Sequence, residues 1–306
     1  MPLEVSAPAV AGSLRDSVSA VASDSSTPPT IVSISDIHGY LENAQEALLT
    51  LTEHPEYDQV VTEDEQGRLH WAGNDYVLVF NGDLIDRGAN NEGVLAMVSR
   101  LIEDAPAGRV RVTLGNHEWM VLMQDPFRGY GWFSTLVSEA QQRQYIQRIY
   151  DGHVVAAYSG HSVSYAHAGS TTPYDVPTVN DSLVAAAREL DPALGTNEES
   201  AVAKKLQKEY RTVLGTGDTR LKGPTAGLVW MHFQHHTSDS PPQVVGHSRQ
   251  LTPQSTGEVY CQDLLLDNRG SLGGHGVFVE TPESLVALTR RDDGGVKRTM
   301  LSEAAE

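Results

Sequence analysis

The chain has 306 residues, 40% of them hydrophobic and 20% charged, a composition that excludes a protein disordered from end to end. Asp and Glu outnumber Lys and Arg by 40 to 22, and the formal charge of -18 repels nucleic acid and anionic lipid surfaces. The sequence lacks the run of about 18 apolar residues that a membrane-spanning helix needs. We therefore expect neither nucleic acid nor a membrane as a partner.

Both ends of the chain are predicted to lie outside the folded domain. Residues 1–29 contain no aromatic residue, and they lack the basic and apolar regions of a secretory signal, so a disordered tail is expected. Residues 291–306 are charged and are expected to fray. One catalytic domain is expected over residues 30–290. The single cysteine, Cys261, cannot form an internal disulfide, and a cytoplasmic location is expected.

Three strand–loop–helix units are predicted in the first half of the chain. Short apolar runs predict buried strands at 31–35, 76–80 and 110–114. Helical patterns follow these runs at about 41–51, at about 91–103 and after residue 116. Repeats of this kind predict a mainly parallel sheet with helices on its faces.

The second half is predicted to combine further strands with three helical stretches. The helices are expected at about 133–150, 181–190 and 198–214. The strands are expected at 153–159, 161–166, 243–245, about 259–267, 277–280 and 285–289.

Polar motifs follow five of the predicted strands, where ligands bind in open α/β sheets. They are Asp36-Ile37-His38, Gly82-Asp83-Leu84-Ile85-Asp86-Arg87-Gly88, Gly115-Asn116-His117-Glu118, His167-Ala168-Gly169 and Gly246-His247-Ser248. Carboxylate and imidazole ligands suit manganese, iron, zinc or cobalt, whereas one cysteine excludes a site of four thiolates. Convergence of these motifs lets one carboxylate bridge two ions about 3.5 to 4 Å apart, the geometry of a two-metal hydrolase.

These five motifs, in this order, resemble those of the calcineurin-like metallophosphoesterases. The resemblance is to the branch of the serine/threonine phosphoprotein phosphatases and the symmetrical diadenosine tetraphosphatases, and it spans about residues 31 to 289. It implies a four-layer α/β/β/α sandwich with mixed sheets. It also implies two divalent metals, one held by Asp36, His38 and Asp83, the other by Asp83, Asn116, His167 and His247. Manganese is the ion we expect first, and iron, zinc, cobalt or nickel also suit the ligands.

The resemblance further implies hydrolysis of phosphomonoesters, either phosphoproteins or small phosphorylated molecules, by in-line attack of a hydroxide that bridges the two metals. His117 would donate a proton to the leaving group, and Asp86 would orient it. Arg87 would bind phosphate oxygens through its planar guanidinium group.

One departure from the family pattern concerns the phosphate. Family members usually supply a second arginine two residues after a tryptophan, but here His232 follows Trp230 at that place. Arg211 and Arg220 are candidates to replace it.

Alternative interpretations remain open at this point. Taken singly, Asp36 and Asp83 also suit helix capping, and His167 also suits a packed core position, although their joint occurrence favours a metal site. Two other functions compete: hydrolysis of dinucleoside polyphosphates, and binding of phosphorylated ligands without turnover, which only the missing arginine favours. The natural substrate and the oligomeric state are not predicted.

Overall fold

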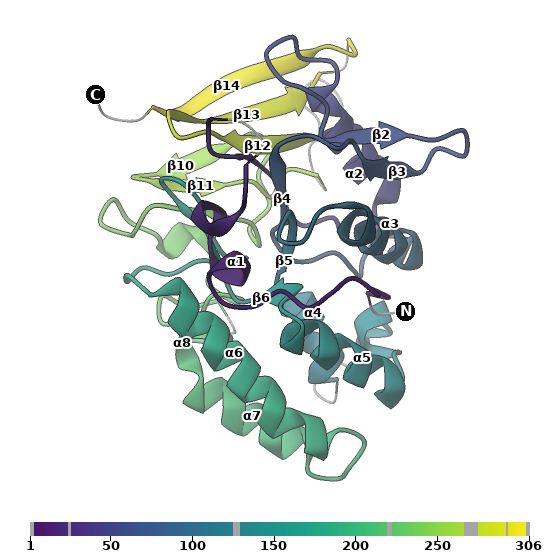
Figure 1. Ribbon diagram of the computed structural model, residues 1–306. Coiled ribbons are helices and arrows are strands. Elements are labelled where there is room, and N and C mark those ends of the chain that lie inside the picture. The colour runs from purple at the N-terminus through teal and green to yellow at the C-terminus, as the bar shows by residue number, and fades with distance from the viewer. Residues whose placement is uncertain are drawn as a thin grey trace.

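Two β-sheets packed face to face form the centre of the molecule (Figure 1). The computed structural model describes residues 3–23, 26–124, 129–218, 222–265, 275–291 and 293–303. No helix in these ranges is long and apolar enough to cross a membrane. The predicted α/β class with mixed sheets is confirmed.

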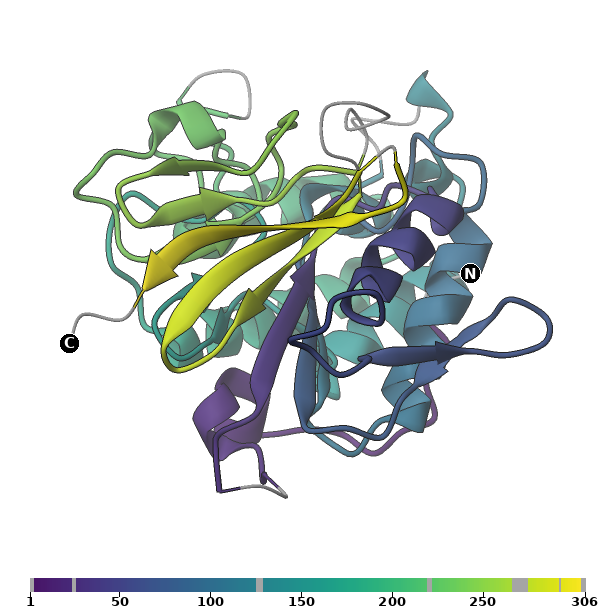
Figure 2. The same cartoon turned by 90° about the horizontal axis from the view of Figure 1, so that it is seen from above.

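The larger sheet has seven strands in the order β14-β13-β12-β1-β4-β5-β6. Its strands β1, β4, β5 and β6 run parallel, as the three strand–loop–helix units predict. An antiparallel meander of β12, β13 and β14 extends the sheet from β1, and Figure 2 shows it in yellow beside the green second sheet. The strands are β1 Thr30–Ile34, β4 Tyr76–Phe80, β5 Val110–Thr113, β6 Val154–Val155, β12 Gly276–Glu280, β13 Ser284–Arg290 and β14 Val296–Glu303.

The second sheet has five strands in the order β10-β11-β9-β8-β7. They are β7 Tyr158–Ser159, β8 Ser164–Tyr165, β9 Gln243–Val245, β10 Gln254–Thr256 and β11 Val259–Cys261. One apolar cluster joins the two sheets, because Val77 and Val79 of β4 share it with Tyr165 of β8 and Val244 of β9. This cluster fixes the strand ends of one sheet against those of the other.

Helices cover the opposite face of the larger sheet. They are α2 Leu41–Leu48, α3 Asn91–Asp104, α4 Asn116–Leu122 and α5 Glu139–Tyr150. Successive residues of a strand point to opposite faces, so Leu78 and Phe80 join the helical core while Val77 and Val79 face the second sheet. Both faces of β4 are therefore buried, which explains its unbroken apolar sequence.

Three further helices lie together at the bottom of Figure 1: α6 Val176–Leu190, α7 Glu199–Glu209 and α8 Arg211–Leu214. Asp175 begins α6 by accepting a hydrogen bond from the Thr178 amide at 3.0 Å. Within α6, the Asn180 side chain accepts hydrogen bonds from the amides of Ala156 and Ala157 at 2.8 and 3.0 Å. These bonds fix α6 to the segment between β6 and β7.

Several element boundaries differ from the predictions. The helix expected over 133–150 is divided into a 3-10 turn, Phe133–Thr135, and α5, because Ser138 and Gln141 form a capping box that starts a new helix. The strand expected over 259–267 ends at Cys261, and residues 266 and 267 lie outside the described ranges. A hairpin of β2 Val61–Glu63 and β3 Leu69–Trp71 was not expected.

The chain ends also differ from the tails expected at 1–29 and 291–306. At the C-terminus, β14 pairs with β13 from Arg290 to Ser284 and forms the edge of the larger sheet. In the N-terminal segment, helix α1 is Ser13–Asp16, and the buried hydrophobic residues are Leu3, Val5, Val10, Val18 and Val21. The reason is apolar burial against the sheets, since Val18 and Val21 belong to the cluster between them.

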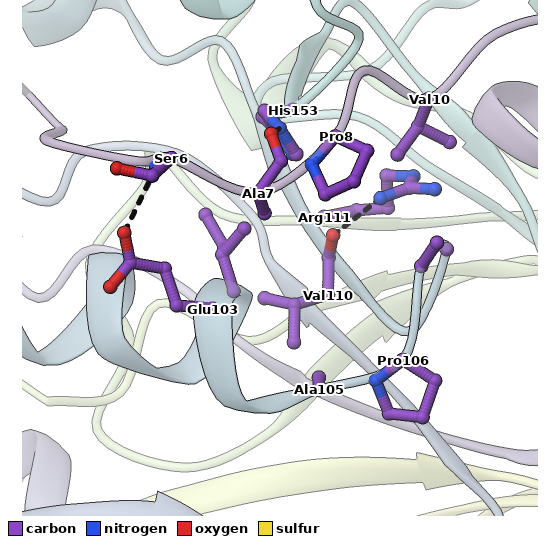
Figure 3. A pocket seen from close by; sticks show the side chains of 13 residues that line it. Ser6, Ala7, Pro8, Val10, Glu103, Ala105, Pro106, Val110, Arg111 and His153 are labelled. Carbon is purple, nitrogen blue, oxygen red and sulfur yellow. Dashed lines mark hydrogen bonds between the residues drawn. The ribbon is translucent and has the colours of Figure 1, made fainter.

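Hydrogen bonds attach the N-terminal segment to the rest of the chain, around a cavity of about 430 Å³ (Figure 3). The Ser6 amide donates to Glu103 Oε1 at 2.9 Å, and Arg111 Nη2 donates to the Leu14 carbonyl at 3.0 Å. Figure 3 shows Ser6 and Glu103 on one side of the cavity, with Pro106 on the other and His153 behind Ala7. The N-terminal segment therefore lines one side of this cavity.

Val18→Asp tests whether this segment is part of the fold. Val18 is 1% exposed, so an aspartate there is buried without a partner, and the free energy of unfolding is expected to fall by about 3 kcal/mol or more. Chemical denaturation measures the effect. Ala11→Asp, at an exposed position of the same segment, is the control and is expected to change stability by less than about 0.5 kcal/mol. Equal stability of both variants would show that the segment contributes nothing to folding.

Candidate metal centre

Strained backbone conformations gather at the carboxyl ends of the strands. Among the described residues, the non-glycine residues with positive φ all belong to the predicted motifs: Asp36, His38, Asp83, Asp86, Arg87 and His247. Such conformations cost about 1 to 3 kcal/mol each and persist where the surrounding structure imposes them, typically at functional sites. Three of the five predicted motifs therefore contain strained backbone that the rest of the fold supports.

Asp83 lies at the centre of this region and is 1% exposed. Its Oδ2 lies 3.4 Å from His38 Nε2, and its Oδ1 lies 3.4 Å from His167 Nε2. The two oxygens of one carboxylate thus face two different histidines. This arrangement is the one expected of a carboxylate that bridges two cations.

His38 belongs to the first of two ligand clusters. Its Nδ1 donates to the Ile85 carbonyl at 2.9 Å, which leaves Nε2 without a proton. This Nε2 lies 3.7 Å from Asp36 Oδ1, and neither His38 Nε2 nor Asp83 Oδ2 has a hydrogen-bond partner, although both are buried. Buried acceptors without donors are costly, and a cation between them satisfies both.

The second cluster joins His167, His247 and Asn116. His167 Nδ1 donates to the Asn81 carbonyl at 3.0 Å, so its Nε2 is the free acceptor. That Nε2 lies 3.2 Å from Asn116 Oδ1 and 3.2 Å from His247 Nδ1. Asn116 Oδ1 and His247 Nδ1 are 2.8 Å apart. All these atoms converge on the side of Asp83 that bears Oδ1.

Burial and neighbouring charges shift the pKa values of the clustered histidines and of Asp83 toward the forms that bind cations. Burial lowers the pKa of His38 and of His247 well below the usual value, which favours the neutral imidazole that metals bind. Burial alone would raise the pKa of Asp83, but four histidines outweigh it and bring that pKa below its usual range: His38, His117, His167 and His247. Asp83 is therefore an ionised carboxylate among neutral and cationic imidazoles.

Two groups of side chains lie close enough together to hold a metal ion. Ligand atoms within 4.8 Å of one another belong to His38, Asp83 and His117 in one group, and to Asp83, His167 and His247 in the other. Asp83 is common to both groups. Each group is therefore able to hold a divalent cation. His117, the predicted proton donor, belongs to the first group, whereas the predicted ligand Asp36 belongs to neither.

His117, Asp86 and Arg87 form a second feature at the edge of the first cluster. His117 Nδ1 and Asp86 Oδ2 are 2.6 Å apart, and Arg87 Nη2 lies 3.4 Å from His117 Nε2. Burial opposes protonation of His117, but Asp83 and Asp86 together outweigh it and raise the pKa of the imidazole. Because Asp86 engages Nδ1, Nε2 is the ring nitrogen that faces Arg87 and Asp83.

Two glycines permit this close packing. At Gly82, which has a φ of +79°, an added Cβ would lie 2.6 Å from His167 Nδ1. At Gly115, an added Cβ would collide with Asp83 Oδ1. Any larger side chain at either position would displace a predicted ligand.

Glu118 supports the Asp83 loop, a role that its motif alone did not reveal. Its carboxylate is fully buried and accepts hydrogen bonds from the amides of Asp83 at 2.8 Å, Leu84 at 2.8 Å and Gly115 at 3.1 Å. These bonds join the loops that follow β4 and β5. Burial and the charge of Asp83 raise the pKa of Glu118 to about 7.

Glu118→Gln is expected to weaken metal binding by about 10- to 100-fold, because the amide has one acceptor oxygen for three backbone donors. Calorimetric titration of metal-stripped protein with Mn²⁺ measures the effect. Glu139→Gln, an exposed side chain on α5, is the control. An unchanged dissociation constant for Glu118→Gln would show that the loop does not depend on this carboxylate.

The three residues predicted to bind the substrate differ in their position relative to the ligand clusters. His232 lies near the second cluster: its amide donates to the Lys222 carbonyl at 3.3 Å, and its charge acts on His247. Arg211 is exposed at the start of α8, and no described contact joins it to the clusters. Arg220 lies outside the described residues.

Two site residues were missed by sequence reasoning. Asp263 follows β11, is 1% exposed, and both its oxygens lack a hydrogen-bond donor; burial and Asp36 raise its pKa well above the usual value. Lys222 interacts electrostatically with Arg87, Asp83 and Asp263, and burial together with the charge of Arg87 lowers its pKa. No motif surrounds either residue, so only the fold reveals them.

Three solved structures of phosphatases align with most of this chain. A cold-active protein tyrosine phosphatase of a psychrophile, Shewanella sp., has 18% identity and a TM-score of 0.60 over 99% of this chain and 91% of that chain. Another structure of a cold-active protein tyrosine phosphatase has 19% identity and a TM-score of 0.60 over 90% and 79% of the two chains. A protein serine/threonine phosphatase from Saccharomyces cerevisiae aligns with 16% identity and a TM-score of 0.44 over 92% and 82%.

At such identities the two higher-scoring structures show a shared fold and nothing more. The family itself comes from a sequence match over more than half of the chain, at residues 29–214, to the family model described as calcineurin-like phosphoesterase. That range contains Asp36, Asp83 and His117, and the later motif around His247 completes the same site in space. The chain therefore belongs to the calcineurin-like phosphoesterase family.

Proposed function

We propose that this protein is a phosphatase that hydrolyses phosphomonoesters with two divalent metal ions, of which manganese is the expected choice. The supporting observation is the buried His117–Asp86 pair, 2.6 Å apart, beside two ligand clusters that share Asp83. A protein that only binds phosphorylated ligands needs no proton donor beside its anion site. The pair therefore favours turnover.

The metals would be held by Asp36, His38 and Asp83 on one side and by Asp83, Asn116, His167 and His247 on the other. Two divalent cations so held supply a water of lowered pKa as nucleophile and positive charge for the phosphate oxygens. The protein holds the metal ligands in fixed orientations. Asn81 and Ile85 orient His167 and His38 through their carbonyls, so each free Nε2 faces Asp83.

Arg87 and Lys222 are the cations that bind the phosphate oxygens in this proposal. The Arg87 guanidinium is exposed and lies against His117 Nε2, where a phosphate at the clusters can accept its hydrogen bonds. Lys222 interacts electrostatically with Arg87 and with Asp83, which indicates that it lies at the same mouth. Lys222 thus binds phosphate oxygens in place of the second arginine that family members usually supply.

His117 donates a proton from Nε2 to the ester oxygen as the bond to phosphorus breaks. Asp86 holds Nδ1 and balances the charge of the imidazolium. Ser134 fixes Asp86 in turn, because its amide donates to Oδ1 at 2.8 Å and its hydroxyl donates to Oδ2 at 2.7 Å. The proton donor is thus oriented by a carboxylate that is itself hydrogen-bonded.

Three substrates separate this proposal from its competitors: p-nitrophenyl phosphate, its bis ester and diadenosine tetraphosphate. The phosphomonoesterase proposal predicts the highest kcat/KM for the first. A preference for diadenosine tetraphosphate would instead identify a dinucleoside polyphosphate hydrolase. Tight phosphate binding without turnover of any of the three would identify a silent binder.

A further inference from the structure

An exposed aromatic surface adjoins the buried histidine of the site. The rings of Tyr130 and Trp132 are stacked, with centroids 4.7 Å apart and planes at 23°. The Trp132 ring lies 5.1 Å from the His117 imidazole. Tyr130 is 66% exposed, whereas His117 is 2% exposed. We call Tyr130 and Trp132 the aryl shelf, because it runs from the surface to the proton donor.

Hydrogen bonds from the same segment hold the aryl shelf in place. Ser134 donates twice to Asp86, the carboxylate that orients His117. Thr135 Oγ1 donates to the Trp132 carbonyl at 2.8 Å. The shelf and the proton donor therefore share one anchor, which sets their relative position.

Tyr130, the outer ring of the aryl shelf, is exposed although burial of such rings is favourable, whereas Trp132 is half-buried against the main apolar core. Tyr130 is one of four large hydrophobic side chains that stand out as exposed in the described chain, and Leu136 of the same segment is another, at 72%. Exposed apolar groups gathered at the mouth of a site are typical of ligand contacts. The place of Trp132 beside His117 points to contact with the part of a substrate that leaves with the ester oxygen.

This inference rests on the proposed function, which determines which part of a substrate lies beside the aryl shelf. The ester oxygen must approach His117 Nε2, so the group attached to that oxygen lies beside Trp132. An alkyl ester such as phosphoserine brings one methylene and then backbone to this place. A nucleotide 5′-phosphate brings a polar ribose. An aryl ester brings a flat ring, which stacks on other aromatic rings at centroid distances of about 4.5 to 7 Å.

We propose that the aryl shelf makes this protein selective for aryl phosphates, with phosphotyrosine side chains preferred over phosphoserine and phosphothreonine. Tyr130 and Trp132 are specificity-determining residues that stack on the leaving-group ring. Stacking energies of this kind correspond to about tenfold in kcat/KM.

The test uses two synthetic peptides that differ only in phosphotyrosine or phosphoserine, with adenosine 5′-monophosphate as a third substrate. Tyr130→Ala is expected to lower kcat/KM about tenfold for the phosphotyrosine peptide, mainly through KM, so that the tyrosine-to-serine ratio falls by the same factor. Comparing each variant with the wild type removes the intrinsic reactivity of the two esters. Tyr130→Phe keeps the ring and is expected to keep the ratio. Met300→Ala, an exposed hydrophobic residue on β14, is the control.

A loss shared equally by both peptides would overturn the proposal, because it would show a structural role for the loop. A loss confined to adenosine 5′-monophosphate would overturn it in favour of a nucleobase site.

Affinity measurements with phosphonates test the selectivity of the aryl shelf independently of turnover. Benzylphosphonate is expected to bind the manganese-loaded wild type about tenfold more tightly than ethylphosphonate, and Tyr130→Ala is expected to remove this difference. Equal affinities in the wild type would overturn the proposal. An inert wild type that still prefers benzylphosphonate would contradict the phosphatase function while supporting the aryl shelf.

Discussion

Asp83→Asn is expected to lower kcat by at least about a thousandfold and to reduce the number of bound Mn²⁺ ions, because both ligand clusters depend on this one carboxylate. Asp83 contributes one oxygen to each cluster, 3.4 Å from His38 Nε2 and 3.4 Å from His167 Nε2. An asparagine has the same shape but no charge, and one of its two terminal atoms is an amide nitrogen that cannot bind a cation. Activity measurements and metal analysis of the same sample give both results.

The control for Asp83→Asn is Asp181→Asn. Asp181 lies on α6, its side chain is 76% exposed, and its ion pair with Arg15 is remote from the clusters. We expect the control to keep both activity and metal content. If Asp83→Asn retained two metals and most of its activity, a shared bridging carboxylate would be refuted.

His117→Asn is expected to lower kcat for a phosphoserine peptide by about 10²- to 10⁴-fold, the usual contribution of a positioned proton donor. The loss is expected to be much smaller for p-nitrophenyl phosphate, because p-nitrophenolate leaves readily without a proton. Metal content is expected to stay the same, because the proposal assigns the metals to Asp36, His38, Asp83, Asn116, His167 and His247, while Asp86 engages His117 Nδ1. Steady-state kinetics on both substrates, with metal analysis, tests all three statements.

The dependence on the leaving group distinguishes two roles for His117. Its ligand atom lies close enough to His38 and Asp83 to hold a metal with them. If His117 were a ligand, its replacement would remove metal and slow both substrates alike. His54→Asn, a histidine beside Tyr57 in the segment before β2, is the control for loss of an imidazole as such.

The strand-end motifs could be predicted because parallel strands bring their carboxyl ends to one edge of a sheet. β1, β4 and β5 are short strands with both faces buried, and a polar motif follows each of them. A resemblance in five motifs then sufficed to predict Asp83 at the centre. His38, His167 and His247, three of the predicted ligands, lie close to Asp83 or to one another in the folded chain.

Other parts of the molecule depend on contacts far apart in the sequence. The N-terminal segment has buried valines without helical or strand periodicity, so its composition suggested a tail. β14 is a half-exposed edge strand with polar residues between its apolar ones. Its charged residues led to the prediction of a tail, although it pairs with β13. Lys222 and Asp263 belong to no motif, and only the folded chain brings them to the clusters.

The aryl shelf was also invisible in the sequence, for a similar reason. Tyr130 and Trp132 lie between α4 and α5, in a segment without a recognisable motif. Their meaning depends on Ser134, which ties the segment to Asp86 across 48 residues of sequence. Hydrogen bonds of this range follow from the packed structure and not from local patterns.

The most direct test of the account is a manganese titration of metal-stripped protein, with p-nitrophenyl phosphate hydrolysis and bound metal measured on the same samples. The account predicts no turnover without metal, and full turnover only when two Mn²⁺ ions are bound per chain. Full turnover in the stripped protein, or saturation of activity at one bound ion, would contradict a two-metal phosphatase built around Asp83.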